Sequence, residues 1–532
     1  MPSTIPDLSY NLAASVHHHS LRTPDALAVA AEGIEISYGE LAPRARNIAV
    51  FLRQSSGWSG ASPTRLPRVA ILGSRSIDAC CAVLGAAWAG ATYVPIGLKS
   101  PEERIVTILA QGEFSAVITD TAGAALLTER VRSACPPLII RPAPHTSGVK
   151  RDSTFCLDHL PEADAAFAPT PIKATDLVYI LFTSGTTGVP NGVMVSAGAV
   201  RHFIKNIVQI LQYRTEDRSL DMFELSFDAS VFSMFGIWEA GASLYLLPAS
   251  KIMYAVKFAR ENRLTIWHSV PSLVSRLKQV HALSPGILPQ VRLSLFGAEQ
   301  LTLGSIETWV KAAPNSTIEN LYGPTEATVA CMHQLLPSTP PIPAKRDVVA
   351  IGIPLPGCEA AIFDASGSPV PDNEPGELAI AGPQLAEGYL HAARLTAEKF
   401  PVIKGVRWYR TGDLACRDEQ GIFHHLGRID NQVKIQGNRV ELEDVDAHLR
   451  AAAGTELAAC VAWPIKNGAA QGLIAFIAGP SRDADQIITA LKTRVPVYMI
   501  PSQVVTLVEL PLSLNGKVDR RALLKFLETP AQ

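Results

Sequence analysis

The chain has 532 residues, which is too long for one hydrophobic core, because single cores stop growing at about 250–300 residues. Hydrophobic residues make up 47% and charged residues 18%, a globular composition that excludes a disordered chain, a coiled coil and a collagen-like polymer. The formal net charge is −2, so no basic excess indicates nucleic acid as a partner. At about 150 residues per domain, the length corresponds to three or four domains.

Cysteine usage and hydropathy indicate the compartment. The eight cysteines form no CxxC pair and are too sparse for a disulfide scaffold, so we expect free thiols in a reducing cytoplasm. The N-terminus has no basic segment followed by an apolar run, so we see no secretory signal. Ala79–Gly97 carries no charge and is nearly long enough for a membrane helix, but it contains Gly85, Gly90 and Pro95. We interpret it as a buried helix followed by a short strand, and expect no membrane span.

Apolar strand patterns recur throughout the chain. Apolar runs bounded by Gly or Pro predict buried strands at Arg68–Leu72, Ala116–Ile118, Val178–Phe182, Leu244–Leu247, Leu293–Phe296 and Leu378–Ala381. Helical patterns lie between them at Asp78–Ala89, Ala199–Leu211 and Pro271–Val280, the last beginning with a proline at a favoured first position. This alternation predicts an α/β fold with largely parallel sheets.

The pattern changes after about Cys358. Short strands are expected at Glu359–Phe363, Gly376–Ala381, Trp408–Tyr409 and Gly421–His425. Turn signals separate them at Gly367, Pro371–Asp372 and Gly412–Asp413. From Gln432 a compact α+β pattern begins, with helices at Glu443–Ala453 and Asp483–Arg494. We predict an N-terminal core over 1–430, with a β-rich part at about 358–430, and a small mobile α+β domain over 431–532.

A loop rich in hydroxyls and glycines follows the strand at Val178. The segment Val178–Gly192 reads VYILFTSGTTGVPNG. Its hydroxyl donors are Thr183, Ser184, Thr186 and Thr187. Its glycines, at which backbone N–H groups can approach an anion, are Gly185, Gly188 and Gly192. The loop suits a triphosphate, although it does not fit the Walker pattern; the alternative is an ordinary polar surface loop.

Further motifs accompany this loop in a fixed order. They are ISYGEL (Ile36–Leu41), WAGATYVPIG (Trp88–Gly97), SFDAS (Ser226–Ser230), NLYGPTEA (Asn320–Ala327), GELAIAGPQLAEGYL (Gly376–Leu390), YRTGDL (Tyr409–Leu414), GRIDNQVKIQGNRVELEDVD (Gly427–Asp446), VYMIP (Val497–Pro501) and PLSLNGKVDR (Pro511–Arg520). With them the chain resembles the adenylate-forming enzymes, particularly the amino-acid adenylation domains of nonribosomal peptide synthesis. Free-standing D-alanine–carrier-protein ligases look like close relatives.

The resemblance implies an acyl-adenylate synthetase fold and two half-reactions. A carboxylate attacks the α-phosphate of ATP, giving an acyl-adenylate and pyrophosphate, and a phosphopantetheine thiol then takes the acyl group as a thioester. The first step needs positioning and charge stabilisation rather than a protein nucleophile. The implied cofactors are ATP and Mg²⁺. Since no phosphopantetheine attachment sequence of the GGxS type follows Arg520, we expect the carrier to act in trans, unless the chain is an excised piece of a larger synthetase. Separately, we expect the protein to be a monomer.

The resemblance also assigns roles to residues. Thr183–Gly188 wraps the pyrophosphate portion of ATP, and Gly323 belongs to the same nucleotide site. Tyr322 stacks on adenine, Asn320 bonds its edge, and Asp413 with Arg428 binds the ribose. Thr325 contacts the α-phosphate and Glu326 helps to hold Mg²⁺. Lys517 is the adenylation lysine, which suits the α-phosphate oxygens and the substrate carboxylate. Each role has a structural alternative. Tyr322 could be a core aromatic, Asp413 an Asx-turn residue and Arg428 an ion-pair partner. Glu326 and Lys517 could be surface charges.

Two further assignments concern the C-terminal domain, and one position departs from the family's usual sequence. Asp430 matches the position of the hinge about which this domain rotates between the half-reactions. Gly437 and the strand around Lys434 would face the carrier in the thioester-forming state. Asn191 stands where the family usually has Lys, which puts the hold on the triphosphate in doubt.

Asp228 indicates the substrate class. In amino-acid-activating relatives an Asp here pairs with the substrate ammonium, and a buried carboxylate needs such a partner; an N-cap role is the alternative. Matching the family's pocket positions places around it Ala229, Phe232, His268, Ser294, Phe296, Gly297, Leu321, Val329 and Ala330. The bulk of Phe232 and Phe296 indicates Ala, Ser or Gly, and a β-amino acid also fits. D-alanine ligases commonly have Cys where this chain has Gly297, which leaves the chirality open.

The leading hypothesis is therefore a free-standing ligase that joins a small amino acid to a carrier protein. An acyl- or aryl-CoA ligase of the same fold is the second, although Asp228 and PLSLNGKVDR argue against it. A catalytically degenerate nucleotide-binding homologue is the third, because of Asn191.

Overall fold

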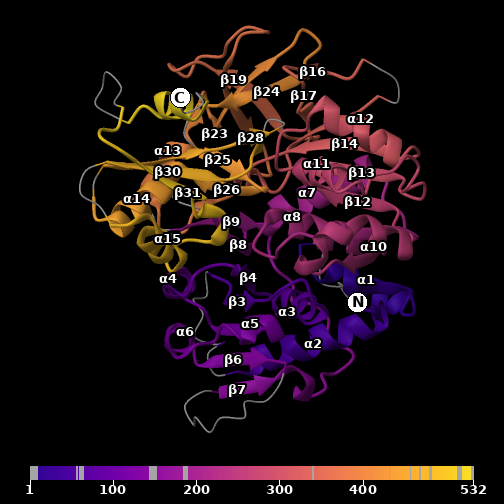
Figure 1. Cartoon of the computed structure of the whole chain (residues 1–532). Helices are drawn as coiled ribbons and strands as arrows, with labels where there is room; N and C mark the ends of the chain where they lie inside the picture. The colour runs from indigo at the N-terminus through magenta and orange to yellow at the C-terminus, as the bar shows by residue number, and fades with distance from the viewer. Residues whose placement is uncertain are drawn as a thin grey trace.

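We describe a computed structural model of the chain (Figure 1). The described residues are 10–55, 58, 65–142, 153–183, 190–337, 341–429, 432–455, 457–466, 469–478, 482–511 and 518–528. The predicted α/β class is confirmed, because two large sheets with mainly parallel neighbours form the N-terminal part.

The first large sheet carries several of the predicted site residues at one edge. Its order is β18 (Ile353–Pro354), β15 (Met332–Leu335), β14 (Thr317–Tyr322), β13 (Leu293–Gly297), β12 (Ile266–Ser269), β10 (Arg218–Asp221), β11 (Ser243–Leu246), β1 (Leu27–Ala31) and β2 (Ile34–Ser37). The strands from β1 to β14 in this order are parallel neighbours. The helices α10 (Ala255–Glu261), α11 (Pro271–Gln279) and α12 (Leu303–Ala312) lie between its strands in sequence. Parallel strands end at the same edge, so β12, β13 and β14 bring His268, Gly297 and Tyr322 together.

The second large sheet contains the two strands that flank the predicted phosphate loop. Its order is β21 (Gly388–Tyr389), β9 (Asn191–Ser196), β8 (Leu177–Thr183), β4 (Thr92–Pro95), β3 (Arg68–Leu72), β5 (Ala116–Thr119), β6 (Leu138–Arg141) and β7 (Ser153–Cys156). The strands β8 and β9 pair antiparallel, with Thr183 opposite Asn191. The loop between them therefore starts and finishes at one point of the sheet edge.

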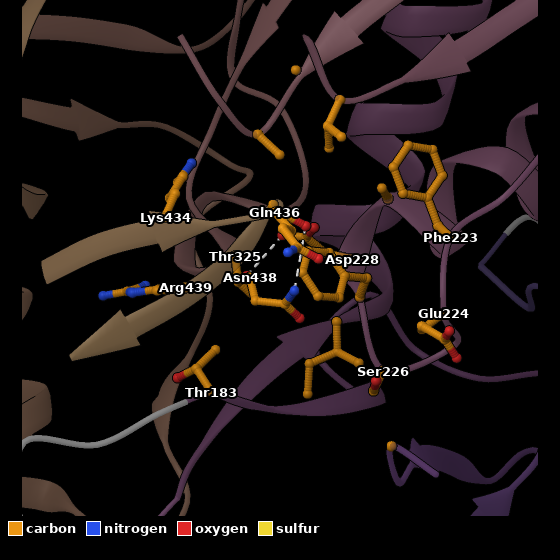
Figure 2. Close-up of a pocket in the computed structure, with 18 of the residues that line it drawn as sticks. Thr183, Phe223, Glu224, Ser226, Asp228, Thr325, Lys434, Gln436, Asn438 and Arg439 are labelled. Atoms are coloured by element: carbon orange, nitrogen blue, oxygen red, sulfur yellow. Dashed lines mark hydrogen bonds between the residues drawn. The ribbon is translucent and has the colours of Figure 1, made fainter. Parts of the chain in front are cut away.

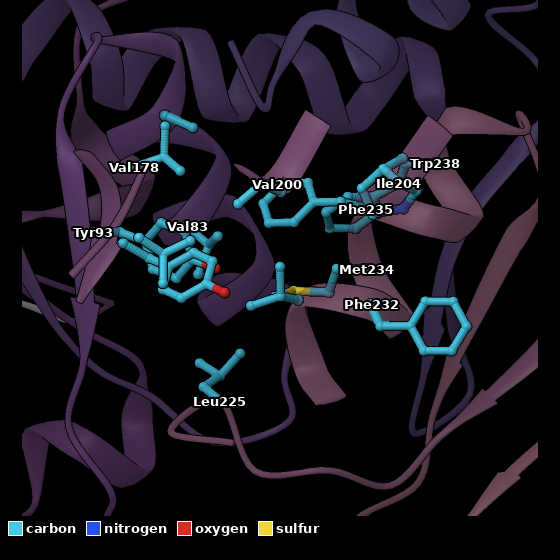
Figure 3. Close-up of a cluster of buried hydrophobic side chains, with 14 of the residues drawn as sticks. Val83, Tyr93, Val178, Val200, Ile204, Leu225, Phe232, Met234, Phe235 and Trp238 are labelled. Atoms are coloured by element: carbon cyan, nitrogen blue, oxygen red, sulfur yellow. The ribbon is translucent and has the colours of Figure 1, made fainter. Parts of the chain in front are cut away.

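The main core joins both sheets. It includes residues of α2 (Tyr38–Gln54), α3 (Ile77–Trp88) and α7 (Ala197–Ile210) together with strands of each sheet. Along α7 the buried residues Val200, Phe203, Ile204 and Ile207 recur at helical spacing, which is why this face packs inward. Figure 3 shows Val200 and Ile204 beside Phe235 and Trp238, with Val83, Tyr93 and Val178 facing them.

The segment examined as a membrane candidate lies in this core. All of α3 except Asp78 is buried, and β4 is buried throughout. Within the described residues, no helix combines the length and the apolar character that crossing a bilayer requires.

The β-rich part contains a correction to the predicted turns. Its sheet consists of β19 (Glu359–Phe363), β20 (Gly376–Ala381), β22 (Val402–Ile403), β23 (Val406–Arg417) and β24 (Phe423–Arg428). Gly412–Asp413 is not a turn between strands but lies inside β23, where the pairing with β20 shifts register between Glu377 and Ala379. Gly412 has φ +73°, a conformation that glycine adopts without strain. A bulge of this kind redirects the neighbouring side chain, here Asp413.

The C-terminal residues have core clusters of their own. The strands β25 (Gln432–Ile435) and β26 (Asn438–Glu441) form a hairpin, and β27 (Ala458–Ala462), β30 (Leu473–Ala478) and β31 (Gln503–Leu507) form a second sheet. Their helices are α14 (Leu442–Ala453), α15 (Ala484–Lys492) and α16 (Arg520–Glu528). The clusters contain only residues beyond 432. A domain boundary near Asp430 stays a prediction, because residues 430 and 431 lie outside the described residues.

Candidate active site

A cavity of about 700 Å³ lies at the carboxyl edge of the first sheet, within the usual size range of small-ligand sites. One wall is the segment after β10 that contains Phe223, Glu224 and Asp228. The opposite wall is the C-terminal hairpin β25–β26, which contributes Lys434 and Arg439. Figure 2 shows Lys434 and Arg439 on one side and Phe223 and Glu224 on the other, with Asp228 between these side chains.

Asp228 begins the short helix α8 (Asp228–Val231) and faces the cavity. Its Oδ2 accepts a hydrogen bond of 2.7 Å from the Thr325 hydroxyl. Burial raises the pKa of the Asp228 carboxyl above its ordinary value, and the hydrogen bond from Thr325 and the charge of Lys434 offset this only in part. The N-cap of α8 is Phe227 rather than Asp228, so the N-cap alternative is wrong. The cavity therefore holds a carboxylate whose charge is incompletely compensated.

Three rings bound the space beside Asp228. The ring centroids of Phe223 and Phe232 lie 4.5 and 5.0 Å from that of His268, which stands between them. Burial lowers the pKa of His268 to about 3, so its imidazole is neutral at neutral pH. Phe232 opens a π-helical turn, Phe232–Gly236, a feature frequent at functional sites. Ala229, Gly297, Leu321, Val329 and Ala330, which were predicted to surround the substrate, also line the cavity.

Two predicted pocket residues face the other side of β13. Ser294 is fully buried and accepts a hydrogen bond of 2.8 Å from Trp309 Nε1. The ring of Phe296 packs edge-on against Trp309 at 5.5 Å, and neither residue lines the cavity. Their assignment is wrong because side chains alternate along a strand and both share the face away from the site. Phe223 supplies the bulk that was expected from Phe296.

Backbone geometry fixes the floor of the cavity. A Cβ atom on Gly297 would lie 2.9 Å from the carbonyl oxygen of Leu321, and one on Gly323 would lie 2.6 Å from Val329 O. Both positions therefore require glycine. Val329 has φ +69°, which is strained for a β-branched residue, and strain of this kind accumulates at ligand sites.

The predicted ribose acceptor has several protein donors. Asp413 accepts from the Tyr322 hydroxyl, from Arg428 Nη1 at 2.8 Å and from His425 Nε2 at 3.2 Å. Burial would raise the pKa of Asp413, but the hydrogen bond and charge of His425, together with Arg428 and Tyr322, hold it well below its ordinary value. Gln300 Nε2 in turn lies 2.9 Å from His425 Nδ1. Asp413 is thus ionised and fixed in place, with acceptor capacity left for a ligand hydroxyl.

Only some of the other residues that the resemblance assigns to the nucleotide line the cavity. Thr183 and Gly323 line the cavity, whereas Ser184, Gly185, Thr186, Thr187 and Gly188 lie outside the described residues. Asn320 does not line the cavity: it is buried, and its Nδ2 donates to Ala350 O at 2.8 Å. Its expected contact with adenine is therefore wrong in this arrangement, because the side chain is already used to hold the loop after β17 (Val348–Val349).

Glu326 does not present a metal site here. The carboxylate is 1% exposed and accepts from Arg439 Nη1 at 2.9 and 2.8 Å and from the Tyr389 hydroxyl at 2.8 Å. Burial would raise its pKa, but the Arg439 charge outweighs this and lowers it. Within the described residues, no group of three or more His, Cys, Asp or Glu side chains could hold a metal. The residues therefore do not fit Mg²⁺ in this arrangement.

The C-terminal hairpin forms a wall of the site, whereas the predicted hinge residue Asp430 and the predicted adenylation lysine Lys517 are not among the residues that the structure describes. A Cβ built on Gly437 would lie 3.0 Å from Val270 Cγ1 of the N-terminal part. Desolvation lowers the pKa of Lys434, which the charges of Asp413 and Asp228 oppose.

Sequence reasoning missed Phe223, His425 and Arg439. Phe223 stands five residues before Asp228, and His425 stands three residues before Arg428. Since both lie close in sequence to residues with assigned roles, this proximity could have indicated that they belong to the site. Arg439 lies within the quoted GRIDNQVKIQGNRVELEDVD segment, but nothing in the sequence indicates that it reaches Glu326.

Comparison with known proteins agrees with the motifs. The family described as AMP-binding enzyme matches residues 16–390. Novobiocin biosynthesis protein H of Streptomyces niveus is 32% identical over 532 residues, covering 98% of this chain and 83% of that protein. Tyrocidine synthase 3 of Brevibacillus parabrevis is 32% identical over 508 residues, but these cover 94% of this chain and only 7% of that protein.

Among solved structures, the Vibrio cholerae adenylation domain AlmE, determined in complex with glycyl-adenosine-5'-phosphate, superposes with a TM-score of 0.86 and 26% identity over 99% of both chains. The parallel-sheet architecture, the cavity at its carboxyl edge and these matches together show that the chain belongs to the AMP-binding family of adenylate-forming enzymes.

Proposed function

We propose that the protein uses ATP to activate a small amino acid as an aminoacyl-adenylate and transfers it to the phosphopantetheine thiol of a separate carrier protein. The observation that carries this proposal is the Asp228 carboxylate, which faces the cavity with a raised pKa. An incompletely compensated carboxylate in such a place binds a cation favourably. The ammonium group of an amino acid is that cation, and fatty or aryl acids lack it.

The size of the substrate follows from the ring wall. Phe223, His268 and Phe232 close the space beside Asp228, so a large side chain has little room. The neutral His268 adds no charge that would select an acidic side chain. The likeness to the adenylation domain solved with glycyl-adenosine-5'-phosphate supports the same substrate class.

The hydrogen bond from Thr325 to Asp228 links the two ends of the proposed site. Because Thr325 Oγ1 lies 2.7 Å from Asp228 Oδ2, the residue assigned to the α-phosphate adjoins the residue assigned to the ammonium. An amino acid held at Asp228 would direct its carboxylate towards the phosphate beside Thr325, which is the positioning that this step needs. Lys517 would add the cation that stabilises the charge on phosphorus.

The test is amino-acid-dependent exchange of labelled pyrophosphate into ATP, with a panel of D- and L-amino acids. Exchange with glycine, alanine or serine supports the proposal, and loading of a phosphopantetheinylated carrier would complete it. Exchange with fatty or aryl acids alone would instead support a CoA ligase. Absence of exchange with every acid, despite ATP binding, would support a degenerate homologue.

A further inference from the structure

The segment between β10 and α8 carries part of the apolar wall of the proposed substrate space. Its residues 222–227 belong to no helix or strand, so side-chain contacts hold it in place. Phe223, on this segment, lines the cavity, and its ring centroid lies 4.5 Å from that of His268. Figure 2 shows Phe223 and its neighbour Glu224 on this stretch of chain, beside Asp228. The position of the Phe223 ring therefore depends on what fixes the residues next to it.

Arg75 contacts the residue on each side of Phe223. Its Nη1 donates to the Met222 carbonyl oxygen, and its Nη2 lies 3.2 Å from Glu224 Oε1. The arginine side chain is only 4% exposed, and hydrogen bonds between charged groups are stronger away from water. Since Arg75 follows β3 of the second large sheet, it joins that sheet to a segment that leaves the first.

Glu224 has a second cationic partner. Lys99, which follows β4 of the second sheet, places its Nζ 3.1 Å from the same Oε1. We call Arg75, Glu224 and Lys99 the Glu224 cluster. The backbone N–H of Phe223 also donates to Asp221 Oδ1, at 3.2 Å, so contacts on both sides of Phe223 fix its backbone.

The charge of Glu224 is already matched by two cations. Although Glu224 lines the cavity, it therefore has little charge left to bind a cationic side chain of a substrate. Any effect of Glu224 on the substrate must then pass through its neighbour Phe223, which presents the ring to the cavity. Neither residue was among those predicted from the sequence to surround the substrate.

We propose that Phe223 is a specificity-determining residue that limits the length of the substrate side chain, and that Glu224 is a positioning residue whose cluster keeps the Phe223 ring in the wall. The inference rests on the proposed function and narrows its substrate class. Glycine, alanine and serine are admitted, whereas the ring excludes longer side chains such as that of leucine.

Pyrophosphate exchange with a size series of amino acids tests the length limit. The measured quantity is the ratio of kcat/KM for alanine to kcat/KM for leucine. Phe223→Ala removes the ring, and we expect this ratio to fall by about ten- to two-hundredfold, the discrimination that a methylene group gives in an apolar pocket. The KM for ATP should stay unchanged, because the residues assigned to the nucleotide are unaltered.

Variants of the Glu224 cluster test the positioning role. Glu224→Gln keeps the shape of the side chain and removes its charge. We expect the same ratio to fall by about two- to fivefold, the contribution of a partly exposed ion pair, through the KM for the amino acid rather than through kcat. Lys99→Met should act in the same direction, and adding it to Glu224→Gln should have no further effect, because the charge of its partner is already gone. The matched control Glu261→Gln removes the carboxylate of the exposed pair with Lys257 on α10 and should leave the ratio unchanged.

A second measurement needs no turnover. Hydrogen exchange of peptides covering residues 219–228 is compared between the wild type, Glu224→Gln and Glu261→Gln, and we expect faster exchange in Glu224→Gln alone. An unchanged ratio in Phe223→Ala, additive effects of Glu224→Gln and Lys99→Met, or unchanged hydrogen exchange in Glu224→Gln would overturn the inference. A wild type that lacks pyrophosphate exchange with every amino acid would count against the proposed function, and the hydrogen exchange would still decide whether the Glu224 cluster holds the segment of Phe223.

Discussion

Asp228 combines two properties that oppose each other. Folding buries the carboxyl and raises its pKa above the ordinary value, so the ionised form is less favourable in the folded protein than in the unfolded chain. The proposed substrate requires the ionised form. The sign of the stability effect follows: the contribution of Asp228 is present below the unfolded pKa and is lost as the pH rises through the folded pKa. At neutral pH the free enzyme is therefore less stable because of this residue.

Replacing Asp228→Asn should separate these properties. We expect amino-acid affinity to fall by about 2–5 kcal/mol, the usual loss when one partner of a buried charge pair is removed. The melting temperature of the free protein at neutral pH should rise, because Asn can still accept from Thr325 without burying a charge. Calorimetry gives the affinity and thermal unfolding the stability. An affinity change below about 0.5 kcal/mol, well under the value for such a pair, would remove Asp228 from the site.

The same carboxyl predicts a pH dependence of the wild type. The ammonium of the substrate stays protonated from about pH 7 downwards, whereas Asp228 takes up a proton as the pH falls through its raised pKa. We expect amino-acid affinity to be greatest near neutral pH and to decline towards acid. A titration of the dissociation constant measures this, with ATP-analogue binding as the reference because Asp413 stays ionised throughout. A flat profile would contradict the assignment.

Gly297 tests how tightly the backbone at the pocket floor is packed. A Cβ atom here would meet the Leu321 carbonyl oxygen at 2.9 Å, and backbone cannot yield as a flexible side chain does. Gly297→Cys, which introduces the residue common in D-alanine ligases, should therefore lower stability by about 1–3 kcal/mol, as overpacking does. Denaturant unfolding measures the loss. The control Gly304→Cys, at a glycine with no atom within 4 Å of its Cβ position, should be much milder.

The residues that could be predicted differ from those that could not in a physical way. Asp228, Thr325, Tyr322 and Asp413 stand in contiguous motifs, so their types and order indicate the chemistry. For Ser294 and Phe296 the prediction placed the side chains on the wrong face of the strand. Matching residues to the family's pocket positions does not take into account that side chains alternate between the two faces. Contacts such as Arg439 with Glu326 join residues 113 positions apart, which no local pattern encodes.

At the scale of elements, the sequence predicts strands correctly where a short apolar run stands between clear turn signals. The strand Arg68–Leu72 and the strand Glu359–Phe363 coincide with β3 and β19, since each is a short apolar run between turn signals. The segment around Gly412–Asp413 failed because a glycine–aspartate pair signals a turn as readily as a bulge within β23. Only the register with β20 distinguishes them, and register is a property of two strands together.

The hairpin β25–β26 can be fixed on the cavity. A Cβ on Gly437 would lie 4.0 Å from Val270 Cβ, inside the about 3.5–4.5 Å range of disulfides. We expect the oxidised double variant Val270→Cys/Gly437→Cys to lose pyrophosphate exchange, because Lys517 could not replace the hairpin at the site. Reduction should restore the exchange.

The reduced protein is also the necessary control for strain. Gly437 has φ +84°, which costs a non-glycine residue about 1–2 kcal/mol, so any loss that persists after reduction reflects the substitution itself. Equal exchange in the oxidised and reduced forms would show that adenylation needs no movement of this hairpin.

For the whole molecule, the two proposed half-reactions require different residues at one cavity. The structure places Lys434, Gly437 and Arg439 along its wall, and the identity of this arrangement as the thioester-forming one stays a prediction. Lys517 would belong to the other. Because the proposed mechanism uses Lys517 in adenylation alone, we expect Lys517→Ala to abolish pyrophosphate exchange while ATP still binds. The same variant, supplied with a synthetic aminoacyl-adenylate, should still load a phosphopantetheinylated carrier at close to the wild-type rate, measured in a single turnover by mass spectrometry. A variant that lost both reactions equally would mean that Lys517 serves the fold or both steps, and the division of labour between the two arrangements would have to be abandoned.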